Sequence, residues 1–191
     1  MAQDVGGLKT AGPWIAKANP TFTVLIDQQH TVSTLYDMVN VPTGVWIDEG
    51  GRLVRPNETA FNDNRFANFH GIDAAPYLEG LRDWLERGDQ SPFVMRPIQL
   101  RHHLNPPDRP ALLADTYFKL AQHLVTIGQE RAAIPYFKQA QQLRPESWAY
   151  KRQAWQFADS DTDYGTNFRT EVAALKGKPF YPPLHLPDQR G

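Results

Sequence analysis

"VNVPTGVWIDEGGRLV", residues 39–54, contains two strand-like runs on either side of a short glycine turn. Both runs are rich in apolar and β-branched residues, as strands usually are. The Glu-Gly-Gly sequence at 49–51 lies between them, and glycine readily adopts the positive φ that a tight hairpin demands. The stretch therefore predicts a β-hairpin over 43–56, preceded by a proline loop.

The segments around this hairpin alternate between strand and helix patterns. Residues 21–27, TFTVLID, are continuously apolar at their centre, which predicts a strand buried on both faces. Asp27 is a suitable residue to start the helix that follows. Apolar spacing predicts helices at 7–18, 30–38 and 76–87. Residues 57–75 show no sustained period and are expected to form a long loop.

This order of buried strand, helix, Asn-Val-Pro-Thr, strand and glycine hairpin resembles the thioredoxin superfamily. Within it, the chain is most similar to redoxin-type thiol-disulfide oxidoreductases of the ResA and TlpA kind, over roughly residues 1–90. The resemblance implies an α/β fold and a cis peptide bond before Pro42. It also implies that Val41, Pro42 and Thr43 contact an extended protein or peptide substrate. The family is often exported or membrane-anchored, which leaves the location of this chain open.

The chain contains no cysteine, so it has no thiolate that could attack or resolve a disulfide. Family members place a strand and a Cys-x-x-Cys helix before the matching segment, and residues 1–4 look like the end of a strand beyond that motif. We therefore expect the C-terminal portion of a redox domain, inactive by itself. Three explanations stay open: the chain is cut, the start codon is placed too far downstream, or an upstream selenocysteine codon is read as a stop. A lineage that has lost the chemistry is the alternative.

An absent central strand has a consequence for the sheet. In the family's fold that strand lies between those matching 22–27 and 43–48, so each would expose unpaired backbone groups. We expect the hairpin to persist. Residues 22–27 are expected to be unpaired, paired directly with 43–48, or completed by another strand.

A second pattern covers the 34 residues 114–147, which are similar to one tetratricopeptide repeat. Small residues allow two helices to approach closely, Gly128 makes the turn between them, and a third helix is expected at 148–157. Six side chains of this all-α module are expected to be largely buried: Tyr117, Leu120, Leu124, Ile134, Phe137 and Trp155. One repeat with a cap favours a packing module over a peptide-binding groove. Pro135 is expected in the first turn of the second helix.

The proline distribution predicts the domain boundaries. We expect a partial thioredoxin-like domain, a Pro-rich linker, a tetratricopeptide-like module and an extended tail that folds back over its own domain, at 1–90, 91–110, 111–158 and 159–191 respectively.

Charge and motif content exclude several function classes. The net charge of −1 does not favour nucleic acid, and no apolar run approaches the roughly 20 residues that span a bilayer. The histidines are dispersed and no phosphate-binding loop occurs, so no metal or cofactor is expected. Two functions remain: the C-terminal portion of a thiol-disulfide oxidoreductase, or a non-catalytic adaptor that binds a protein partner through its helices.

Overall fold

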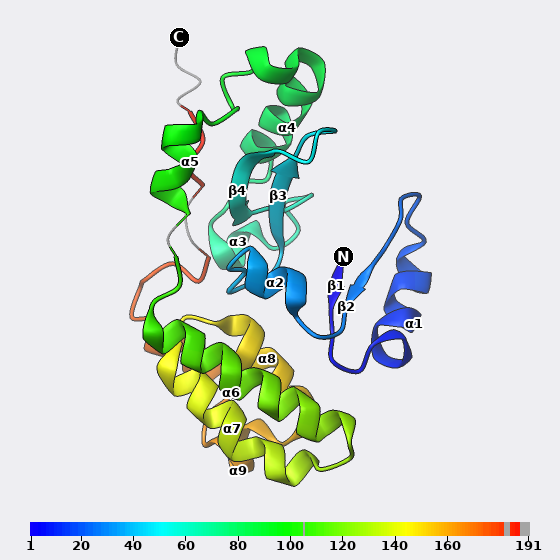
Figure 1. The fold of residues 1–191 in the computed structure, drawn as a ribbon, viewed down its shortest axis with the longest axis vertical. Coiled ribbons are helices and arrows are strands. Elements are labelled where there is room, and N and C mark those ends of the chain that lie inside the picture. The colour runs from blue at the N-terminus through cyan, green and yellow to red at the C-terminus, as the bar shows by residue number, and fades with distance from the viewer. Residues whose placement is uncertain (105, 182–183, 188–191) are drawn as a thin grey trace. The chain divides into compact units, whose positions relative to one another are not determined.

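Helices predominate over strands in this chain, so the fold is mixed but mostly helical (Figure 1). The structure is a computed structural model that describes residues 1–104, 106–181 and 184–187. It divides into two compact units, Met1–Val39 with Pro107–Phe168 and Asn40–Pro106 with Arg169–Gly191. The domains expected from the sequence are four consecutive segments of the chain. Each observed unit instead combines two segments that are far apart in the sequence.

The N-terminal stretch of the first unit contains a minimal parallel sheet. β1 (Ala2–Gln3) pairs with β2 (Ile26–Asp27), and α1 (Leu8–Ala18) connects them. Of the outcomes expected for 22–27, pairing with another strand is therefore the one observed, at Ile26 and Asp27. The expectation of a seven-residue strand buried on both faces is wrong, because Phe22 is 70% exposed and Leu25 is 64% exposed. Both residues lie before β2, and within the described residues β2 pairs only with β1.

Asp27 contacts the start of the next helix but is not its first residue, because the N-cap is His30. Its buried carboxylate accepts hydrogen bonds from the backbone N–H of Thr31 at 2.8 Å and of Ser33 at 3.0 Å. These N–H groups have no partner inside a helix, so the carboxylate satisfies them. The helix, α2 (Thr31–Leu35), is shorter than the expected 30–38.

The helical module of the first unit confirms the expected hairpin and third helix. Its elements are α6 (Arg109–Thr126), α7 (Glu130–Leu143), α8 (Trp148–Phe157) and α9 (Ser160–Tyr164). Gly128 has a φ of 77° in the turn between α6 and α7. Small and aromatic residues from three helices form the core: Ala114, Phe118, Ala121, Ala133, Phe137, Ala140, Tyr150 and Ala154.

The burial expected for this module is only partly correct. Phe137 is buried, and four of the six named side chains are half-buried: Tyr117, Leu124, Ile134 and Trp155. Leu120 is 39% exposed, so its expected burial is wrong. It follows Phe118 by two residues, a turn of about 200° around the helix, so it points away from the packed face. Pro135 is the sixth residue of α7 and lies beyond the first turn.

The second unit is built around the hairpin predicted by the sequence. β3 (Thr43–Ile47) and β4 (Leu53–Thr59) are antiparallel, and Gly51 has a φ of 78° in their connection. α4 (Ala75–Arg87) corresponds to the expected helix at 76–87. The core of this unit consists of Trp46, Val54, Tyr77 and Phe93.

Three stretches expected to be irregular contain short helices. The expected loop 57–75 includes the end of β4 and α3 (Ala67–His70), and the expected linker includes α5 (Pro97–His103). Helix α9 and α10 (Phe168–Ala174) lie in the region expected to be extended, and η1 (Gly88–Gln90) follows α4. The expectation that the tail packs on its own domain is confirmed, because Leu184 and Leu186 contact the core of the second unit. Pro182 and Pro183 lie outside the described residues.

Candidate functional site

The proline loop expected to contact substrate lies at the start of β3 in the second unit. The Val41–Pro42 peptide bond is cis, which is the isomer implied by the resemblance. Val41, Pro42 and Thr43 are each half-buried. The loop is therefore held within the unit rather than projecting from it.

Both backbone polar groups of Val41 have partners inside the second unit. Its N–H donates to Oδ1 of the preceding Asn40 at 2.9 Å. Its carbonyl accepts from the hydroxyl of Tyr181 at 3.0 Å. Asn40 also donates through Nδ2 to the carbonyl of Phe180 at 3.3 Å. The C-terminal segment thus occupies the Val41 carbonyl of the loop that the sequence predicted to contact substrate.

The following two residues are tied to the hairpin. The Pro42 carbonyl accepts from the N–H of Ala60 at 3.3 Å, and the Thr43 hydroxyl donates to the carbonyl of Glu58 at 2.9 Å. Thr43 also pairs with Thr59 in the antiparallel ladder. These bonds fix the loop to the end of β4, so its position depends on the hairpin.

An aromatic cluster holds the C-terminal segment near this loop. The rings of Phe61 and His70 stack with centroids 3.9 Å apart, and the Tyr181 ring meets Phe61 edge-on at 5.1 Å. Phe180 contacts Tyr181 at 4.6 Å and Phe69 at 5.8 Å. Tyr181 is buried, with 7% of its surface exposed. The aromatic residues interleaved with prolines in the tail were the sequence signal for this packing, but they did not identify Val41 as the contact.

A buried ion pair, not anticipated from the sequence, lies on β4. Arg55 donates through Nε and Nη2 to the two carboxylate oxygens of Glu58, at 3.0 Å and 2.7 Å. It also donates to the carbonyls of Phe93 at 2.6 Å and His185 at 2.9 Å, and it lies over the Trp46 ring, 5.5 Å from the centroid. Only 2% of the Arg55 side chain and 6% of the Glu58 side chain are exposed. The guanidinium therefore connects β4 to two other segments of the unit.

The pairing of Arg55 with Glu58 depends on an irregular ladder. Residues three apart in a regular strand point to opposite faces of the sheet. Here Gly44 is opposite Glu58 while Trp46 is opposite Arg55, so β4 contains one residue more than β3 between these pairs. An extra residue of this kind is a β-bulge, which redirects side chains. It brings both charged groups to the same face, where they bind each other.

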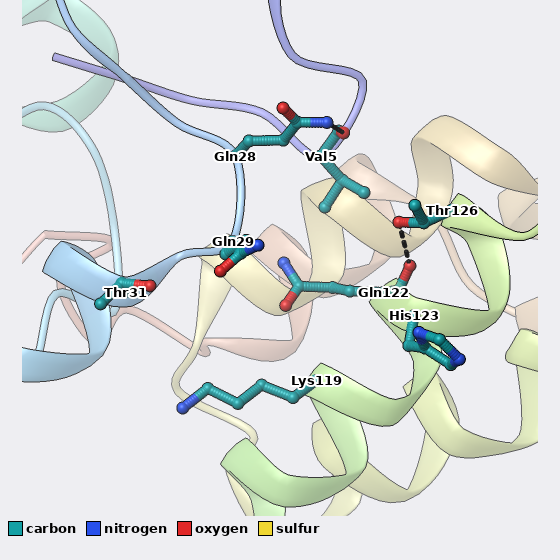
Figure 2. Close-up of a pocket in the computed structure, with 8 residues that line it drawn as sticks. All are labelled: Val5, Gln28, Gln29, Thr31, Lys119, Gln122, His123 and Thr126. Atoms are coloured by element: carbon teal, nitrogen blue, oxygen red, sulfur yellow. Dashed lines mark hydrogen bonds between the residues drawn. The ribbon is translucent and has the colours of Figure 1, made fainter.

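A cavity of about 480 Å³ lies in the first unit, beside α6 (Figure 2). It is lined by Val5, Gln28, Gln29, Thr31, Lys119, Gln122, His123 and Thr126. Figure 2 shows Lys119 and Gln122 extending from α6 toward the side of Gln29 and Thr31. No carboxylate lines the cavity, although the Lys119 ammonium forms an ion pair with Asp115 at 2.9 Å. Amides, hydroxyls and one ammonium group therefore line it together with a larger share of apolar atoms.

His30 lies next to this cavity and joins the N-terminal stretch to α6. It is 3% exposed, has a φ of 54°, and its ring lies 5.1 Å from Phe118, edge to face. Nε2 of Gln122 lies 2.8 Å from Nδ1 of His30. An amide nitrogen can only donate, so Nδ1 is the acceptor and the imidazole is neutral. Burial lowers the pKa of His30 below its ordinary value, against a smaller opposite effect of Asp27.

The histidines do not form a metal centre. His102, His103 and His185 line a second cavity, of about 380 Å³, in the second unit. Across the described part of the chain, no three side chains of histidine, cysteine, aspartate or glutamate are grouped so that they could hold a metal ion. None of the helices in that same part is long and apolar enough to cross a bilayer.

Comparison with known proteins yields no relative: no protein-family model, curated protein or solved structure matches this chain.

Proposed function

We propose that this chain is the C-terminal portion of a thioredoxin-like thiol-disulfide oxidoreductase of the redoxin type. In this proposal it contributes the substrate-facing loop formed by Val41, Pro42 and Thr43, and it supplies no reacting thiol. The supporting observation is a minimal parallel sheet in the first unit, flanked by large apolar side chains that are exposed.

β1 and β2 pair through only two residues each. Parallel strands are normally covered on both faces, and an isolated two-stranded sheet is at best marginally stable. Large apolar side chains around this sheet and its flanking helices are nevertheless exposed by 64–75%: Leu8, Trp14, Phe22, Leu25 and Leu35. An exposed apolar surface of this kind usually contacts further polypeptide. The strand and cysteine-bearing helix of a thioredoxin-like domain would provide that contact.

In this proposal the missing portion supplies the reacting thiols and this chain supplies the substrate-binding loop. A thiolate attacks one sulfur of the substrate disulfide and releases the other as a thiol. A second enzyme thiol then attacks the mixed disulfide, so the substrate leaves reduced and the enzyme holds the new disulfide. This chain has no cysteine and can take part in neither step. Its loop would hold the substrate backbone in an extended form while the thiols react.

The gene upstream of codon 1 provides the test. We expect it to encode a strand and a Cys-x-x-Cys motif, or one cysteine codon and an in-frame UGA. The protein expressed from this longer frame should reduce insulin with dithiothreitol as the electron donor, whereas the 191-residue chain should not exceed background. An upstream frame without either feature, or turnover by the 191-residue chain, would contradict the proposal.

A second candidate is an adaptor that binds a protein partner through its tetratricopeptide-like helices. The cavity beside α6 favours it, because its lining includes the exposed Gln29 and the Lys119 side chain, which is 51% exposed although it pairs with Asp115. In affinity capture, an identified partner should be lost when Lys119→Glu reverses the charge at the cavity. It should be retained by Lys9→Glu, the same change at an exposed position on α1. A partner bound equally by both variants would exclude this site.

A further inference from the structure

We infer that Phe180 and Tyr181 form an intramolecular latch over the proline loop, which must release Val41 before an extended polypeptide can pair with it. This inference rests on the proposed function, because it concerns regulation of the same loop. Both latch residues and the loop belong to the second unit.

Asn40 connects the latch to the loop. Its side-chain oxygen accepts from the N–H of Val41 and its side-chain nitrogen donates to the carbonyl of Phe180. The Tyr181 hydroxyl then closes the remaining position by donating to the Val41 carbonyl at 3.0 Å. The two backbone groups through which an extended peptide would form a ladder are therefore both occupied.

The latch is seated by ring contacts. Tyr181 packs edge-on against Phe61 and His70, with centroids 5.1 Å and 5.8 Å away. Phe and Tyr carry no charge, so neutral hydrogen bonds and ring contacts hold the segment. Another polypeptide chain could therefore replace these hydrogen bonds and ring contacts with similar ones of its own.

A bound substrate strand would replace Tyr181 at the Val41 carbonyl. The Val41 carbonyl accepts from the hydroxyl of Tyr181 in the latched form. A substrate strand would offer a backbone N–H to the same carbonyl, as in β-strand addition to an exposed edge. Val41 thus keeps a donor in both states, and the two states compete directly for one acceptor.

Tyr181→Phe is the discriminating variant, because it removes the hydroxyl and keeps the ring. The matched control is Tyr164→Phe, which removes a buried hydroxyl of the first unit that has no hydrogen-bond partner among the described residues. The probe is fluorescein-labelled, reduced and carboxymethylated insulin B chain, an extended polypeptide without reactive thiols. Binding to the full chain is measured by fluorescence anisotropy.

We expect Tyr181→Phe to bind the probe about fivefold more tightly than the wild type, the effect of losing one neutral hydrogen bond from the competing state. Tyr164→Phe should bind like the wild type. Equal or weaker binding by Tyr181→Phe overturns the latch, and so does the same gain in Tyr164→Phe.

A second measurement needs no probe. Hydrogen exchange at the Val41 amide should be faster in Tyr181→Phe than in the wild type, because release of Phe180 frees Asn40; unchanged exchange overturns the latch. Faster exchange without probe binding by any form overturns the gating of a polypeptide site. If the gene upstream of codon 1 encodes no cysteine, the proposed redox chemistry is refuted. The probe-binding and hydrogen-exchange measurements would still test the latch.

Discussion

Replacing Arg55 with methionine should destabilise the second unit by about 3–5 kcal/mol, the usual cost of leaving one member of a buried ion pair without its partner. The structure places this site at the upper end of such effects. Only 2% of the Arg55 side chain and 6% of the Glu58 side chain are exposed. The substitution also removes the donors to the carbonyls of Phe93 and His185.

A double-mutant cycle separates the ion pair from the other contacts. Arg55→Met and Glu58→Gln should each be strongly destabilising, whereas the double variant should cost less than their sum by about 1–3 kcal/mol, as expected for directly interacting residues. The matched control is Arg52→Met on the same hairpin. Arg52 pairs with Asp48 and Asp89, but its side chain is 54% exposed, so its removal should change stability far less than the removal of Arg55.

Hydrogen exchange provides the assay, because it reports on each unit separately. Amides of β3 and β4 should lose protection in Arg55→Met, while those of α6 and α7 serve as the internal reference. Three results would refute the reasoning: an effect of Arg55→Met no larger than that of Arg52→Met, additive single substitutions, or equal loss of protection in both units.

Three further substitutions test the packing and the buried histidine. Gly44→Ala should destabilise the hairpin by about 1–3 kcal/mol, because the added Cβ would lie 2.1 Å from the Tyr77 hydroxyl oxygen; unchanged urea unfolding of the second unit would show that Tyr77 can move away. Phe137→Ala should cost the helical module about 3–5 kcal/mol in the same assay, and a smaller loss would mean that the core collapses around the gap. The pKa of His30 is lower in the folded chain than its ordinary value of about 6.5. Below that pH the unfolded chain therefore binds more protons than the folded chain. The free energy of unfolding of the first unit should be highest above about pH 6.5 and should decrease as the pH falls from there toward the lower pKa of the folded state. His30→Asn, which tolerates the left-handed backbone, should show a flatter profile between pH 7.5 and 5, and parallel profiles would exclude His30 as the cause.

Local patterns were sufficient to predict several elements of this fold. The hairpin, α4 and the α6–α7 pair all have short-range signals, namely a glycine turn or apolar residues at helical spacing, that later packing reinforces. The apolar run at 21–27 was misleading for a physical reason. Its composition fits burial on both faces, but burial depends on the elements packed over those faces, which a local window does not contain. In the structure only Ile26 and Asp27 obtain a ladder partner.

The candidate site was predictable only in part. The Val-Pro-Thr motif located the loop at 41–43, because it belongs to a contiguous pattern. The contact between Tyr181 and Val41 joins residues 140 positions apart, and no spacing rule connects them. The pair of Arg55 and Glu58 was equally hidden, because an alternating strand would place the two residues on opposite faces. Only the bulge on β4 makes them neighbours.

The C-terminal segment links the stability of the second unit to the accessibility of its loop. It supplies the hydroxyl that satisfies Val41, the carbonyl of His185 that accepts from Arg55, and apolar side chains that cover the core. Within the described residues β3 pairs only with β4, so these contacts complete a hairpin that has no further strand beside it. A segment that completes the unit in this way also withholds the Val41 carbonyl from any other chain. The groups that would make the loop a binding site are therefore the ones that the isolated unit needs to satisfy internally.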